Sequence, residues 1–264
     1  MFFKKFREIN KVCFKFLSRR FQYFKFDTVL RFLSNIVYIV LNILFWFLVK
    51  DAGFSIKGWT FDDILVFVAF SELFYSIESS MFGMVSRFWK VIYSGALDTL
   101  LIRPLDPRLR FAMLNINYGG ILDAFIKFII LLLISRKQVS IIMILAGIIV
   151  VFFANTILAL IRLFLSYSAF WFGKMDALSE LADSMTQFNK YPLVIMPKFT
   201  KILFTFAIPF YFFSTFSSEL VLGKLNSITL IIGILGLCVN LLLWIVLNNI
   251  LWKKGRARYE SING

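Results

Sequence analysis

The stretch SGALDTLLIRPLDPRLR, from Ser94 to Arg110, lies between two long apolar segments and is the most informative part of this sequence. It contains one glycine, two prolines, two aspartates and three arginines. Charges are costly inside a bilayer, so this stretch cannot span one. If its apolar neighbours do span a membrane, it must lie at the membrane surface.

Local chemistry predicts how this stretch folds. Asp98 is placed to cap a short helix with an apolar face, and Pro104 disfavours helical geometry at the residue before it, which ends that helix. Asp106 followed by Pro107 predicts a second helix start, because the first helical position tolerates a proline. The prediction is a bent, amphipathic surface element. Composition alone is equally compatible with a plain connecting loop.

The pattern Gly95-x-Leu97-Asp98-x-Leu100-Leu101-x-Arg103-Pro104-Leu105-x-Pro107 resembles the cytoplasmic loop of type-2, exporter-like bacterial ABC transporter permeases. Two further stretches support the resemblance: Phe170 to Lys174 leading to Tyr191-Pro192, and Trp252 to Glu260. The resemblance implies that residues 94–110 form a coupling helix that docks in a groove of a separate ATPase. The coupling residues it implies are Gly95, Leu97, Asp98, Leu100, Leu101, Arg103, Pro104, Leu105, Pro107 and Arg108, with Asp98, Arg103 and Arg108 as polar anchors.

Composition identifies a polytopic membrane protein. The 264 residues are 60% hydrophobic, against about 45 to 50% in soluble domains. The chain has no histidine, which excludes His-ligated metal sites and His acid/base catalysis. Cys13 and Cys238 are far apart and predict free thiols, with neither a disulfide nor a metal site. The net charge of +14 comes from basic residues that flank apolar spans, a pattern of membrane topology that argues against nucleic-acid binding.

The apolar pattern predicts an all-α fold with six transmembrane helices at about 32–49, 61–84, 116–134, 141–172, 201–216 and 228–252. Residues 87–113 form the coupling loop and 173–200 a second cytoplasmic segment, while 253–264 form a cytoplasmic tail. Residues 1–28 contain eight Lys and Arg and predict a cytoplasmic interfacial amphipathic helix, which either packs near the ATPase or only binds headgroups. With both termini inside, cytoplasmic segments carry 22 basic residues and outer loops five.

Ionisable residues within the predicted spans indicate partners or a polar path. At about 1.5 Å per residue, Glu72 and Lys127 both lie near the midplane, so we hypothesise that they pair or share a polar surface with Ser71 and Ser76. Such a pair either fixes helix register or contacts the substrate. Glu78 and Arg162 lie near the cytoplasmic end and are interpreted as snorkelling or interface charges. By resemblance, Pro209 and Glu219 belong to an outer region with short re-entrant helices.

No enzymatic chemistry is evident in the sequence. A phosphate-binding glycine loop with Lys-Ser/Thr is missing, so we expect ATP and magnesium to bind a partner ATPase and no cofactor to bind this chain. The resemblance implies two copies of that ATPase and a second permease chain, identical or homologous, in a bacterial cytoplasmic membrane. The predicted function is export of a hydrophobic or amphipathic substrate. The alternative is a non-transporting membrane anchor or sensor that recruits a soluble partner.

Overall fold

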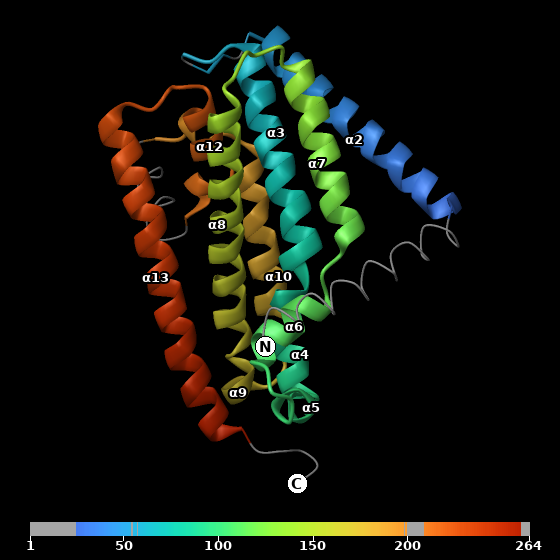
Figure 1. Cartoon of the computed structure of the whole chain (residues 1–264), viewed down its shortest axis with the longest axis vertical. Coiled ribbons are helices and arrows are strands. Elements are labelled where there is room, and N and C mark those ends of the chain that lie inside the picture. Colours follow the sequence, from blue (N-terminus) through green and yellow to red (C-terminus); the bar gives the residue numbers. More distant parts are fainter. Residues whose placement is uncertain (1–24, 54, 57, 198, 200–208, 260–264) are drawn as a thin grey trace.

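The computed structural model describes residues 25–259 except 54, 57, 198 and 200–208. Every regular element within these residues is a helix, which confirms the predicted all-α fold class (Figure 1). The long helices are α2 (Lys25–Asp51), α3 (Phe61–Ile77), α7 (Tyr118–Ile134), α8 (Ile141–Ser166) and α13 (Ser227–Arg258). The short α-helices are α4 (Phe88–Tyr93), α5 (Leu97–Leu101), α6 (Pro107–Leu114), α9 (Ala169–Phe172), α10 (Asp176–Ser184) and α12 (Thr215–Val221).

Four helical segments are long and apolar enough to cross a membrane: Leu33–Asp51, Phe61–Tyr93, Ile141–Phe172 and Ser227–Arg258. A fifth span is present if α6 and α7, which meet at a bend of 66°, cross the membrane as one broken helix. In the remaining predicted span, the fifth at 201–216, residues 201–208 lie outside the described part of the chain, and residues 209–216 contain a 3₁₀ turn and the start of α12. Most of the predicted interfacial helix at 1–28 also lies outside the described residues. Five spans are therefore the most that the described residues support.

Helix α3 is the centre of the bundle. It begins at Thr60, whose hydroxyl accepts a hydrogen bond from the Asp63 backbone N–H at 3.3 Å, while the Asp63 carboxylate accepts one from the Thr60 N–H at 2.8 Å. This reciprocal cap satisfies two backbone donors that a helix start leaves free. Of the span that α3 opens, 83% is buried, because α7, α8 and α12 pack around it. A helix apolar on all sides is expected at such a central position.

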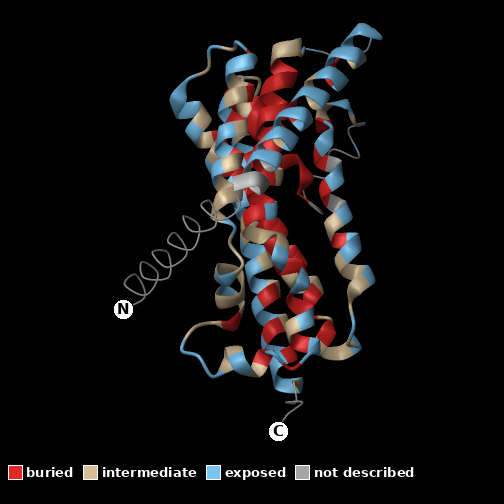
Figure 2. Ribbon diagram, turned by 90° about the vertical axis from the view of Figure 1, so that its right-hand side faces the viewer, coloured by how far each residue is buried: buried red, intermediate tan, exposed pale blue. Residues whose placement is uncertain are grey.

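The two outermost helices have large exposed apolar faces. Only 11% of the span in α2 and 22% of that in α13 are buried. Figure 2 shows exposed, pale blue ribbon around a red, buried core. In Figure 1, α13 and α2 lie on opposite sides of the bundle, and α2 tilts away from it toward its N-terminal end. Apolar faces of this extent suit lipid or a partner chain.

The chain reverses direction at both ends of the bundle, and we name the two ends after the sequence segments that they contain. The hairpin end holds the loops at 51–60, 135–140 and 222–226, and the motif end holds α5, α9 and the last turns of α13 (Figure 1). Most buried apolar side chains form one core along α3, α7, α8 and α12. A second cluster at the motif end combines Phe88, Trp89, Ile92, Leu97, Tyr167, Ala169 and Trp252.

Part of the segment 173–200 packs into the bundle. Leu193 is 1% exposed and belongs to the main core, and Asn189 is 3% exposed. Side chains of α3 donate hydrogen bonds to backbone carbonyls of this segment. The Ser71 hydroxyl donates to the Asn189 carbonyl at 3.0 Å, and the Tyr75 hydroxyl donates to the Thr186 carbonyl at 2.5 Å. Thr186, Asn189 and Leu193 are therefore buried against the bundle, while Gln187, Lys190 and Tyr191 between them are exposed.

Candidate functional site

Residues 94–110 form two short helices that are joined by a turn. Gly95 precedes α5 with a φ of 74°, a left-handed conformation that favours glycine. Helix α5 starts at Leu97 without a side-chain cap, so Asp98 lies in its first turn rather than at the predicted capping position. Helix α6 begins as predicted: the Asp106 carboxylate accepts from the Arg108 backbone N–H at 2.8 Å, and Pro107 is the first helical residue. The expected bent element is therefore present.

The predicted coupling residues divide into a buried base and an exposed tip. Gly95, Leu97 and Pro107 are buried, and Leu97, fully buried, belongs to the second apolar cluster. Arg103 and Pro104 are exposed, while Asp98, Leu100, Leu101, Leu105 and Arg108 are half-buried. Ile102, which the sequence analysis did not select, is 81% exposed and is an apolar side chain at the centre of the tip. The sequence feature that could have identified Ile102 is its position directly before Arg103-Pro104, where the short helix ends.

Arg108 points into the protein and links the loop to α13. Its guanidinium forms an ion pair with Asp106 at 2.6 Å, donates to the Asn249 side-chain oxygen at 3.0 Å, and lies 5.4 Å from the centre of the Trp252 ring. Partial burial disfavours ionisation of Asp106, but hydrogen bonds from the Arg108 side chain and backbone outweigh it and lower the pKa of this carboxyl. Arg108 thus holds α6 against α13, a role the sequence did not indicate.

Asp98 also contributes to the contact between the loop and the end of α13. Burial, together with the neighbouring Asp98 carboxylate, raises the pKa of Tyr259 to about 12. Tyr259 is the residue that follows α13. The 94–110 stretch and residues 252–259 of the C-terminal stretch, both singled out in the sequence, therefore meet at the motif end.

The predicted pair of Glu72 and Lys127 does not form an ion pair among the described residues. Glu72 is 4% exposed, accepts a hydrogen bond from the Asn42 amide of α2 at 3.2 Å, and lies beside the Tyr38 hydroxyl. Lys127 is half-buried on α7, close enough only for a longer-range electrostatic interaction. The hypothesis of a direct ion pair was wrong, because the Glu72 carboxylate is bound by side chains of α2 rather than by Lys127. Ser71, its proposed polar neighbour, lines the same pocket as Glu72 and also donates a hydrogen bond to the Asn189 carbonyl.

Glu78 and Arg162 form a buried ion pair, in contrast to the snorkelling charges expected from the sequence. Arg162 of α8 is 3% exposed, and its guanidinium binds the Glu78 carboxylate directly. Its other terminal nitrogen lies 3.2 Å from the Asp183 carboxylate of α10. One arginine therefore joins three segments that are far apart in the sequence.

The helix type changes in the second span next to this ion pair. Residues Glu78–Phe82 form a π-helical turn and Gly83–Arg87 a 3₁₀ turn, between the α-helical segments α3 and α4. The π turn leaves the Ser80 carbonyl available, and it accepts a hydrogen bond from the Asn117 N–H at 2.7 Å, where α6 bends into α7. Breaks of this type occur at hinges and functional sites.

Pro209 and Glu219 flank a buried reversal of the chain. Pro209 precedes a 3₁₀ turn at Phe210–Phe212, and Glu219 lies in α12, where its carboxylate accepts a hydrogen bond from the Tyr211 hydroxyl. The Ser214 hydroxyl bonds to the Asn189 side chain, and the Thr215 hydroxyl accepts from the Leu193 N–H at 3.1 Å. Irregular backbone at membrane depth requires such partners within the protein.

A pocket of about 280 Å³ opens between α2, α3 and the segment at 190–191. Aromatic side chains form much of its wall, and Glu72 and Asn42 provide polar groups. No Lys or Arg nitrogen lies within ion-pair distance of Glu72 among the described residues, although Lys190 also lines the pocket. The aromatic lining residues are Tyr38, Phe45, Trp46, Phe67, Tyr75 and Tyr191.

These features define a multi-pass, all-α membrane protein with a folded loop at one end and a polar pocket between its helices. The family model for the ABC-2 family transporter protein matches residues 36–263, and the chain belongs to this family. It is therefore a permease subunit of an ABC transporter, a membrane transport component that works with an ATPase. No curated protein and no solved structure matches the chain significantly.

Proposed function

We propose that the chain exports a hydrophobic or amphipathic substrate and that the tip of the 94–110 loop docks on the partner ATPase. The observation that carries the docking proposal is an 81% exposed Ile102, flanked by exposed Arg103 and Pro104, on a loop whose base at Leu97 is fully buried. An exposed apolar side chain on a fixed support suits a docking contact that must transmit force.

In this proposal two ATPase copies bind ATP and magnesium, while a second permease chain, identical or homologous, completes the translocation path. The exposed faces of α2 and α13 are large enough to contact lipid and that second chain. The basic residues concentrated at the motif end support a cytoplasmic location for it, with both termini on that side of a bacterial cell membrane.

The pocket between α2 and α3 is the cargo site that we propose. Aromatic walls favour an apolar body, and a buried carboxylate without an ion pair favours a positively charged group beside it. Replacing Glu72 by Gln is expected to reduce transport of an amphipathic cation at least tenfold and to leave a neutral analogue nearly unchanged. Equal loss for both cargoes would contradict this assignment.

Docking is tested by co-expressing the chain with a candidate ATPase and measuring both pull-down and ATP hydrolysis. Ile102→Asp is expected to abolish complex formation and to lower cargo-stimulated hydrolysis at least tenfold, because it places a charge in an apolar contact. Ser94→Asp is the matched control, since it adds the same charge at an exposed position of the same loop. Normal binding and hydrolysis with Ile102→Asp would refute the docking role of the tip.

A further inference from the structure

A groove separates the coupling loop from the end of α13 at the motif end. It has a volume of about 560 Å³ and runs between Leu101, Arg103 and Leu105 on one side and Trp252, Arg256 and Tyr259 on the other. The groove is not explained by docking of the loop tip, because Trp252 and Arg256 belong to a different helix.

The groove has a positive charge that the described residues do not neutralise. Arg103 and Arg256 are both exposed, and neither forms an ion pair within the described part of the chain. Asp106 also lines the groove, but its carboxylate is bound by Arg108. Within residues 25–259 as described, two arginines from separate elements therefore face an open space without an ion-pair partner.

The position of the groove along α13 matches the headgroup layer. The apolar part of α13 runs from Ser227 to Leu251, which is about 37 Å at 1.5 Å per residue and is enough to cross the hydrocarbon. Trp252 follows at once, as expected for an aromatic residue at the interface. Arg256 lies about 6 Å beyond Trp252 along the helix axis, a distance that matches a headgroup layer extending roughly 5 to 8 Å beyond the hydrocarbon.

We propose that this groove binds the headgroup of an anionic phospholipid, with Arg103 and Arg256 on its phosphate and glycerol groups. Arginine binds phosphate through two parallel hydrogen bonds, and the apolar walls at Leu101, Leu105 and Trp252 suit the glycerol backbone and the start of the acyl chains. The bound lipid bridges the coupling loop to α13. The position of the loop then depends on the lipid composition of the membrane.

Native mass spectrometry of the purified full-length chain tests this proposal, with an equimolar mixture of phosphatidylglycerol and phosphatidylcholine as the probe. The wild-type chain is expected to retain phosphatidylglycerol preferentially. The double variant Arg103→Ala with Arg256→Ala is expected to bind it roughly 10- to 30-fold more weakly, as two lost headgroup contacts imply. Arg103→Lys with Arg256→Lys keeps the charges and is expected to bind with intermediate affinity.

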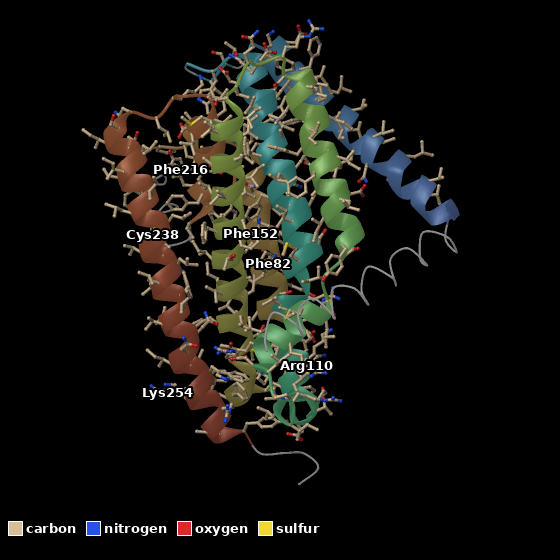
Figure 3. All side chains as sticks on the ribbon, in the orientation of Figure 1. Phe82, Arg110, Phe152, Phe216, Cys238 and Lys254 are labelled. Carbon is tan, nitrogen blue, oxygen red and sulfur yellow. The ribbon has the colours of Figure 1, made fainter. Side chains whose placement is uncertain are left out.

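The matched control is Lys253→Ala with Lys254→Ala, which removes two positive charges from the same turns of α13 without altering the groove lining. Figure 3 shows Lys254 pointing away from the bundle. This control is expected to keep the preference for phosphatidylglycerol, and excess inorganic phosphate is expected not to displace the lipid.

Three results would overturn the proposal. Equal loss of the lipid in the arginine and lysine variants would indicate general attraction to the basic surface. Displacement by inorganic phosphate would indicate a site for a soluble anion. If the arginine variant binds lipid normally but loses the ATPase, the groove is part of the ATPase contact.

Discussion

At the scale of single residues, the buried charges of this permease subunit are held by specific partners from distant segments. Arg162 binds Glu78 and Asp183, and Asp63 lies between two lysines. Removing one member of a buried ion pair leaves an uncompensated charge, which costs about 3 to 5 kcal/mol, whereas replacing both members is often nearly neutral. A structural ion pair should therefore lose stability when one member is replaced and regain it when both are replaced. A charge that serves transport should not show this recovery of activity.

We predict that Arg162→Met alone lowers the stability of the purified chain by about 3 kcal/mol or more, because Glu78 stays buried without its cation. The double variant Arg162→Met with Glu78→Gln is expected to recover much of this loss. Thermal unfolding in detergent, followed by circular dichroism, measures these two variants and Glu78→Gln alone. If the double variant loses the sum of the two single losses, Arg162 and Glu78 are not energetically coupled.

Asp106 has a predicted pH dependence. Its pKa is lowered in the folded chain by Arg108, so its ionised form stabilises the loop above the unfolded pKa of about 3.9. This stabilisation is lost as the pH falls through the lower, folded pKa. Asp106→Ala is expected to cost about 1 kcal/mol at neutral pH through the lost helix cap. The difference in unfolding temperature between wild type and Asp106→Ala should shrink below pH 4; a constant difference would contradict the ionic contribution.

At the scale of helices, close packing holds α13 against the rest of the bundle near the motif end. A Cβ atom added to Gly255 would lie 2.2 Å from the ring of Phe170, which follows the start of α9. Real Cβ atoms do not approach this closely, so a side chain at this position requires a shift of the Phe170 ring or of the two helices. Figure 3 shows Cys238 further along the same helix, and this residue is exposed.

We therefore predict that Gly255→Leu weakens the packing of the end of α13 on α9, so that this helix end unfolds locally and trypsin cleaves faster after the exposed Lys253 and Lys254. Overpacking of this kind typically costs about 1 to 3 kcal/mol. Cys238→Leu is the control, because an exposed position on the same helix accepts the same side chain. Unchanged proteolysis of Gly255→Leu would show that this contact is not required to hold α13 in place.

Sequence reasoning succeeded for elements whose signals are local. The cap at Asp106 and the proline at Pro107 identify the start of α6 without any knowledge of the fold. It failed where contacts depend on how helices are rotated and tilted. The π-helical turn after Glu78 shifts the phase of the second span, and Asn42 approaches Glu72 from another helix. The polar residues near Asn189 look like a surface loop in the sequence because their partner, Ser71, is 118 residues away.

At the scale of the whole molecule, the hairpin end is fastened by one buried carboxylate. Lys137 and Lys224, from the loops before α8 and α13, lie 2.8 Å and 3.0 Å from the two oxygens of Asp63 at the start of α3. The residue is 2% exposed. Three elements that are separated in the sequence are thereby joined at a single residue.

We predict that this cluster responds non-additively to substitution. Lys137→Ala and Lys224→Ala should each have a small effect, because Asp63 keeps one cation. Their combination should destabilise the chain by about 3 kcal/mol or more, since the buried carboxylate then has none. Unfolding temperatures of the four proteins measure this. Two single losses that simply add would mean that the lysines do not share one carboxylate.

The change of helix type between Glu78 and Arg87 has a mechanical consequence for the whole chain. The hydrogen-bond pattern there changes from α to π and then to 3₁₀, so this part of the second span bends more easily than a regular α-helix. In contrast, α13 is one uninterrupted helix of 32 residues. A load applied at 94–110 is then expected to bend the second span at this joint and to tilt α13 as a rigid rod. Glu72 lies less than two helical turns from the change of helix type. Bending there is therefore expected to move the walls of the pocket, while the hairpin end, held by the Asp63 ion pairs, stays in place.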